Sequence, residues 1–132
     1  HNKSKNLIMI IPVVTKDIMF FSKLKSSINS DRYSLEQVKN KEDILDILIK
    51  SDYPLCIIDF SSDLIELPKF KDIFKNRGLH TINTVGYYPH VNKILKQKAI
   101  DFGTKKQVTR NQLMKNINNI VDDCIYNEMS SD

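Results

Sequence analysis

Short apolar stretches alternate along this chain with segments in which apolar residues recur every three or four positions. The stretches predict five strands, at residues 7–14, 33–38, 54–59, 81–88 and 105–109. The segments predict five helices, which begin after Thr15, after Asn40, at Pro68, near Val91 and after Asn111. Strands and helices take turns, and their connections are short. This order predicts a parallel sheet covered by helices on both faces, an α/β fold.

The spacing of apolar residues also predicts which helix faces are buried. The first helix is expected to bury a stripe made of Ile18, Phe21, Leu24 and Ile28. The last helix is expected to bury Leu113, Ile117, Ile120, Val121 and Cys124. Gly103 is expected to end the helix before the fifth strand. That strand is short and polar, which is typical of a sheet edge.

Length and composition indicate one globular domain. The chain has 132 residues, of which 41% are hydrophobic and 27% charged, so it can bury a core. We expect the domain to span residues 7–126, with a polar tail at 127–132 and a disordered tail or trimming remnant at 1–6. No apolar run is long enough to span a membrane, and no secretory signal precedes the first strand. Cys56 and Cys124 are expected to be reduced core thiols, which favours a cytoplasmic protein.

The net charge of +4 raises the question of nucleic-acid binding. The lysines are spread along the chain with acids among them, which is typical of a solvated surface. We therefore do not expect this domain to bind nucleic acid. The three glycines stand singly and form no glycine-rich phosphate loop, so a dinucleotide or nucleoside-triphosphate site is not expected either.

Asp59 is the main candidate for chemistry, because it ends an apolar strand. In open α/β sheets, ligands gather at the carboxyl ends of the strands, where Asp59 should meet Tyr88 and Arg110. A carboxylate at a partly buried strand end needs a partner, and we expect an ion pair with Arg110, direct or through water. Ser61 and Ser62 are interpreted as caps or turn formers.

Two segments carry a resemblance to a known family. The segments YSLEQVKNKEDILDILIKSDYPLCIIDFS (33–61) and QKAIDFGTKKQVTRNQL (97–113) resemble the receiver domains of two-component response regulators. The resemblance runs from about Leu7 to Val121 and implies a flavodoxin-like (βα)₅ fold. It places Asp59 at the family's phosphoacceptor aspartate, Tyr88 at its switch threonine or serine, and Arg110 at its invariant lysine.

The chain departs from the receiver family at the positions that bind magnesium and respond to phosphorylation. Receivers have two magnesium-binding carboxylates at the end of the first strand, and the resemblance places Pro12 and Val13 there. Neither side chain offers the hard oxygen ligands that Mg²⁺ takes. Tyr88 is bulkier than threonine, and Arg110 lacks the compact ammonium of lysine. The resemblance therefore implies a pseudo-receiver, with no metal, no cofactor and no catalysis.

The leading hypothesis is a non-catalytic signalling module that binds another protein or a second copy of itself. In receivers, partners dock on the surface formed by the fourth helix, fifth strand and last helix, where this chain has Lys93, Lys105 and Lys106. Two alternatives stay open. Asp59 could accept a phosphoryl group with a degraded metal dependence, or the strand-end pocket around Tyr88 and Arg110 could bind a small anion or nucleotide.

Overall fold

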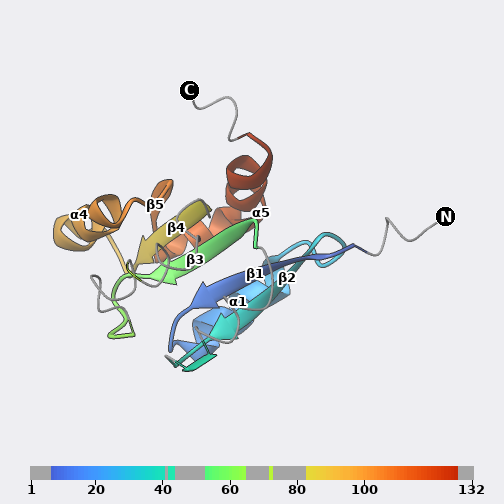
Figure 1. Ribbon diagram of the computed structural model, residues 1–132, viewed down its shortest axis with the longest axis horizontal. Helices are drawn as coiled ribbons and strands as arrows, with labels where there is room; N and C mark the ends of the chain where they lie inside the picture. The colour runs from blue at the N-terminus through green and yellow to red at the C-terminus, as the bar shows by residue number, and fades with distance from the viewer. Residues whose placement is uncertain (1–6, 41, 44–52, 65–71, 73–82, 128–132) are drawn as a thin grey trace.

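The sheet has five parallel strands. The computed structural model describes residues 7–40, 42–43, 53–64, 72 and 83–127. Within them the strands run in the order β2-β1-β3-β4-β5 (Figure 1). Their bounds are β1 (Met9–Val14), β2 (Tyr33–Val38), β3 (Leu55–Asp59), β4 (Asn83–Tyr88) and β5 (Lys106–Thr109). This order confirms the expected flavodoxin-like sheet, with β5 at one edge.

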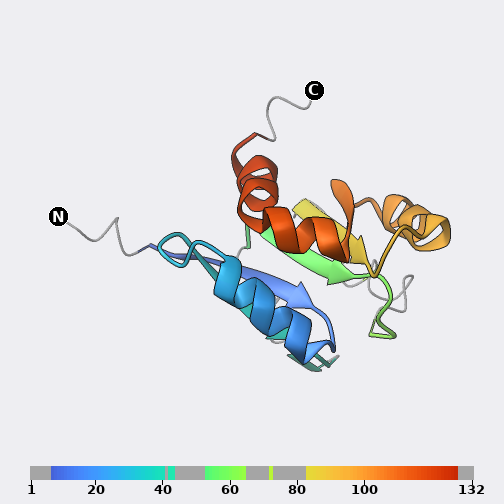
Figure 2. The same cartoon turned by 180° about the vertical axis from the view of Figure 1, so that it is seen from behind.

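Three helices are described: α1 (Ile18–Ser27), α4 (Lys93–Phe102) and α5 (Arg110–Tyr126). Helices α1 and α5 lie together on one face of the sheet, as Figure 2 shows from behind. The helix expected after Asn40 begins there, because Asn40 Oδ1 accepts a hydrogen bond from Asp43 N at 2.8 Å. The rest of that helix and nearly all of the one expected at Pro68 lie outside the described residues. No helix in the described part of the chain could cross a membrane.

The strands separate two hydrophobic cores, since successive side chains of a strand point to opposite faces. The core under α1 and α5 includes Ile11, Phe20, Leu24, Ile57, Tyr87, Leu113 and Val121. The core on the other face includes Val14, Cys56, Ile58, Phe60, Ala99 and Phe102. Both cysteines are buried and unpaired. All five residues expected on the inner face of α5 are buried, which confirms that stripe.

Helix α1 buries Phe21 and Leu24, and Ile28 is buried at its end, as predicted, but the helix differs from its prediction in its cap and at Ile18. Its N-cap is Asp17 rather than Thr15, and the Asp17 side chain accepts a hydrogen bond from Phe20 N at 3.0 Å. Ile18 was expected to be buried but is 57% exposed. Phe20 is buried instead, with its ring centroid 5.1 Å from that of Tyr87. A large aromatic ring buries more apolar area than Ile18 would, so it sets the phase of the first turn.

Helix α5 is capped by Thr109 rather than by the expected Asn111. The Thr109 hydroxyl accepts from Gln112 N at 3.1 Å, and Gln112 Oε1 accepts from Thr109 N at 2.8 Å. This reciprocal capping box satisfies two backbone donors at once, which an isolated Asn111 cap could not do. The box makes Arg110 the first residue of the helix.

The middle of α5 is kinked at Asn116, whose backbone is not helical (Figure 2). Beyond the kink, the Asn118 amide holds the end of α1. Its Oδ1 accepts from Asn29 N at 2.7 Å, and its Nδ2 donates to Ser27 O at 3.0 Å. These two bonds fix the second half of α5 against α1.

We predict that Gly86→Ala destabilises the protein. A Cβ at Gly86 would lie 2.7 Å from the Phe60 ring and 2.9 Å from Ala99 Cβ, so Phe60 or α4 must move. Overpacking of this kind should lower the free energy of unfolding by about 1–3 kcal/mol, measured by denaturant titration. Adding Phe60→Leu should recover part of the loss. If the double variant is as unstable as the sum of the single variants, the Phe60 contact is not the cause.

Candidate functional site

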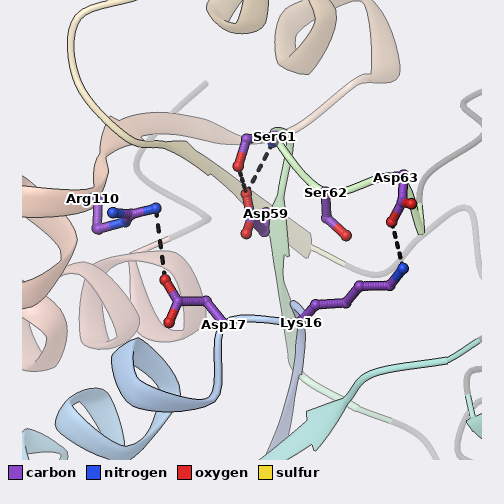
Figure 3. Close-up of a pocket in the computed structure, with 7 residues that line it drawn as sticks. All are labelled: Lys16, Asp17, Asp59, Ser61, Ser62, Asp63 and Arg110. Carbon is purple, nitrogen blue, oxygen red and sulfur yellow. Dashed lines mark hydrogen bonds and ion pairs between the residues drawn. The ribbon is translucent and has the colours of Figure 1, made fainter.

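Asp59 is a buried carboxylate whose two oxygens are bonded by neutral donors. Asp59 is the last residue of β3, and it is 4% exposed. Oδ2 accepts from Thr15 Oγ1 at 3.0 Å. Oδ1 accepts from Ser61 N at 2.9 Å and from Ser61 Oγ at 2.6 Å (Figure 3). A buried charge is tolerable when its lone pairs are used in this way.

The segment after Asp59 is a hydrogen-bonded turn. Ser61 and Ser62 were interpreted from the sequence as caps or turn formers, and they form this turn. Ser61 closes on the carboxylate, and Ser62 N donates to Asp59 O at 3.2 Å. Ser62 Oγ in turn accepts from Leu64 N at 3.1 Å. The serines therefore form the turn that leaves β3.

The end of β1 corrects the expected position of Pro12 and Val13. Strand β1 continues to Val14, and its pairing of Val13 with Ile57 places Thr15 next to Asp59. Pro12 lies inside the strand, two residues from its end, so it does not border the site. Thr15 is fully buried, and its Oγ1 also accepts from Asp17 N at 3.0 Å. The predicted end of the strand at Val14 is correct, so Thr15, rather than Pro12 or Val13, is the residue that borders Asp59.

Arg110 contacts Asp17, not Asp59. Its Nη2 lies 3.7 Å from Asp17 Oδ2, and its Cζ lies 5.4 Å from the centroid of the Phe20 ring (Figure 3). The expected direct ion pair with Asp59 is not formed. The reason is that Thr15 and Ser61 already occupy the Asp59 oxygens, while the half-buried Asp17 lies at the start of α1 within reach of Arg110. Among the described residues, the buried Arg110 Nε has no hydrogen-bond partner.

Tyr87 and Tyr88 are both buried, although one of them was expected to line the strand-end surface. Tyr87 pairs with Asp59 in the sheet, whereas Tyr88 pairs with Thr109. The two rings point to opposite faces, and Tyr88 does not line the pocket described below. Burial raises the pKa of Tyr87, and the charge of Asp59 raises it further. Tyr87, rather than Tyr88, is therefore the phenol beside Asp59.

A pocket of about 400 Å³ opens beside Asp59 at the carboxyl ends of the strands (Figure 3). Its lining residues are Lys16, Asp17, Asp59, Ser61, Ser62, Asp63 and Arg110. Lys16 Nζ lies 2.7 Å from Asp63 Oδ1, and their side chains are 55% and 80% exposed. The pocket is thus lined by three carboxylates and two cations, and two of the carboxylates each contact a cation.

The residues around this pocket do not fit a magnesium ion. Among the described residues, no three carboxylate, histidine or cysteine side chains are grouped so as to hold a metal. Asp59 keeps its oxygens on Thr15 and Ser61, while Asp17 and Asp63 each face a side-chain cation. A divalent ion needs several oxygens turned toward one point.

Sequence reasoning missed Thr15 as the donor to Asp59, and Lys16, Asp17 and Asp63 as pocket residues. A signal was present, because Asp17 stands just before a helical pattern, where a cap is expected. Reading Asp17 as the cap leaves Thr15 in the connection just after β1. It also brings Lys16 and Asp17 to the strand-end face. Asp63 had no such signal, because its position depends on the turn made by Ser61 and Ser62.

The three lysines predicted to form an interaction surface lie on α4 and around β5. Lys93 begins α4 and Lys106 begins β5, and both are exposed. Lys105 is half-buried, and its Nζ donates to the Cys124 carbonyl at 3.4 Å. Lys105 is thus tied to α5, whereas Lys93 and Lys106 present their charge to solvent.

Comparison with known proteins gives a fold but no close relative. No protein-family model and no curated protein matches the sequence. A response regulator from Thermotoga maritima superposes with a TM-score of 0.74 at 16% identity, over 90% of this chain and 98% of that one. A two-component response regulator from Clostridium difficile gives 0.73 at 18% identity, over 93% and 99%. The chain has the fold of a receiver domain.

A third structure with this fold is described as an atypical orphan response regulator with a phosphorylation-independent regulatory mechanism. It superposes with a TM-score of 0.68 at 12% identity, over 89% of this chain and 95% of that one. At such identities the likeness extends to the fold alone, so the receiver-like site must be judged from its own residues.

We predict that Thr15, not Arg110, stabilises Asp59. Thr15→Val keeps the shape but leaves Oδ2 without a donor, which should lower the free energy of unfolding by about 1–3 kcal/mol. Arg110→Gln should cost at most about 1 kcal/mol, because its contact is long and partly exposed. Both measurements use denaturant titration.

Double-mutant cycles with Asp59→Asn separate the two contacts. The coupling with Thr15→Val should be about 1 kcal/mol or more, and the coupling with Arg110→Gln below about 0.5 kcal/mol. A larger coupling for Arg110 would show that an Asp59–Arg110 pair operates in solution.

Proposed function

We propose that this protein is a pseudo-receiver, a non-catalytic signalling module that works through protein–protein contacts without phosphorylation of Asp59. One observation carries the proposal: both Asp59 oxygens are hydrogen-bonded, to Thr15 and Ser61, and no three metal-ligating side chains of the described residues are grouped at the pocket. An attacking carboxylate needs an oxygen that faces the phosphoryl group, and phosphoryl transfer needs its developing charge neutralised. In this arrangement the two oxygens face other donors, and the two pocket cations already face other carboxylates.

Two further observations support the proposal. A structure with the same fold is titled as a phosphorylation-independent orphan regulator, so the fold is compatible with this mode of action. The two buried, unpaired thiols suit the reducing cytoplasm, where we place the protein.

The contact surface we propose consists of Lys93, Lys105 and Lys106, on α4 and around β5. It would dock an acidic protein or a second copy of the chain. Exposed Lys106 sits on the edge strand of the sheet, where a lysine discourages uncontrolled strand pairing but attracts an acidic surface.

We predict that acetyl phosphate with millimolar Mg²⁺ does not phosphorylate Asp59. Intact-mass spectrometry should show no added phosphoryl group on wild type or on Asp59→Asn. A phosphoryl group on wild type that is absent from Asp59→Asn would refute the phosphorylation-independent mode. A typical receiver treated in parallel verifies the reagent.

We predict that reversing exposed charge on this surface weakens partner binding or self-association. Lys93→Glu with Lys106→Glu is the sharper pair, because Lys105 also bonds the Cys124 carbonyl and its loss could disturb α5. Lys23→Glu with Lys25→Glu makes the same charge change on exposed positions of α1 and is the matched control.

The readouts are sedimentation over concentration and salt series, and capture of partners from lysate. Wild-type association should weaken with added salt, because exposed charges are screened within about 8–10 Å. Equal behaviour of the two double variants would remove the Lys93–Lys106 surface from the proposal.

A further inference from the structure

The pocket beside Asp59 contains its own counter-ions. Asp17, Asp59 and Asp63 contribute three negative charges, and Lys16 and Arg110 contribute two positive ones. The pocket is therefore nearly neutral before any ligand enters, with one net negative charge. In a receiver-like fold this is the place where a divalent metal would be expected.

Each of the three carboxylates already has hydrogen-bond or ion-pair partners within the protein. Asp17 Oδ1 caps α1 by accepting from Phe20 N, and its Oδ2 faces Arg110. Asp63 Oδ1 lies 2.7 Å from Lys16 Nζ, an ordinary distance for a charge-assisted hydrogen bond. The Asp59 oxygens are held by hydroxyl and amide donors. A metal would have to take these oxygens from their present partners.

The fold sets the backbone positions of the two cationic residues. Arg110 is the first residue of α5, its guanidinium lies over the Phe20 ring, and its Nε is buried. Lys16 follows the strand end that carries Thr15, so the hydrogen bond of Thr15 to Asp59 fixes the backbone position from which Lys16 extends. The Lys16 ammonium and the Arg110 guanidinium lie on either side of Asp59 in Figure 3.

We propose that Lys16 and Arg110 are the resident counter-ions of this pocket and exclude a divalent metal from it. Mg²⁺ or Mn²⁺ would meet the positive charges of Lys16 and Arg110, and no three carboxylate, histidine or cysteine side chains of the described residues are grouped around one point to hold it. This inference deepens the proposed function, because it names why the pocket works without metal.

The test uses the whole protein and the metal alone. Thermal unfolding is followed with MgCl₂ or MnCl₂ against NaCl of equal ionic strength, and Mn²⁺ binding is measured by water-proton relaxation. Wild type should give the same melting temperature in all three salts and no saturable Mn²⁺ binding. Saturable binding that Asp17→Asn abolishes would overturn the proposal.

Removing the cations should create the site. Lys16→Gln with Arg110→Gln removes the cations that face Asp63 and Asp17, so these carboxylates can turn toward a shared ion, and millimolar Mn²⁺ should bind and raise the melting temperature, reversibly with EDTA. The matched control, Lys93→Gln with Lys106→Gln, removes the same charge outside the pocket and should gain nothing. A Lys16–Arg110 double variant that binds no Mn²⁺ would show that these cations are not what excludes the metal.

A single variant serves as a fallback for the double variant. If the double variant does not fold, Lys16→Gln alone carries the test, because its side chain is 55% exposed and its removal should not disturb the core. Failure here is also distinct from failure of the proposed function. Wild type that binds Mn²⁺ but resists acetyl phosphate would overturn only the counter-ion role, whereas phosphorylation of Asp59 in metal-free buffer would overturn only the phosphorylation-independent mode.

Discussion

The hydrogen bond from Thr15 to the buried Asp59 carboxylate is the contact on which the strand-end face depends. A carboxylate that is 4% exposed must have its lone pairs satisfied, and here the ends of two neighbouring strands do so together. Thr15 also accepts from Asp17 N, and Asp17 caps α1 and faces Arg110 of α5. One buried charge therefore sets the position of a loop, a helix start and a second helix.

The same strand end joins the two cores. Phe60 follows Asp59 and packs on Gly86, Ala99 and Phe102 under α4, while Tyr87, the strand partner of Asp59, packs on Phe20 of α1. Aromatic rings therefore pack on both faces of the sheet next to the Asp59 turn.

Much of the fold could be predicted from the sequence, because strand and helix periods report burial directly. The order of strands and helices along the chain and the inner face of α5 follow from that period, whereas the order of the strands within the sheet was implied by the resemblance to receiver domains. Caps are harder to choose in this way, since Thr15 and Asp17 are both good cap residues and stand before the same helical pattern. The partner of Asp59 was mispredicted for a related reason: pairing opposite charges ignores neutral donors, and two hydroxyls and an amide were nearer than Arg110.

The distribution of charge separates the pocket from the rest of the surface. The five charged pocket residues contribute a net −1 to the chain's net +4, so the remaining residues carry a net +5. A small anion is thus drawn less to the pocket than to the outside of the molecule. The acidic partner proposed above would meet this basic excess without entering the pocket, at exposed positions such as Lys93 and Lys106. Because hydrogen bonds within the protein satisfy the Asp59 carboxylate, the proposal places such contacts on the outer surface.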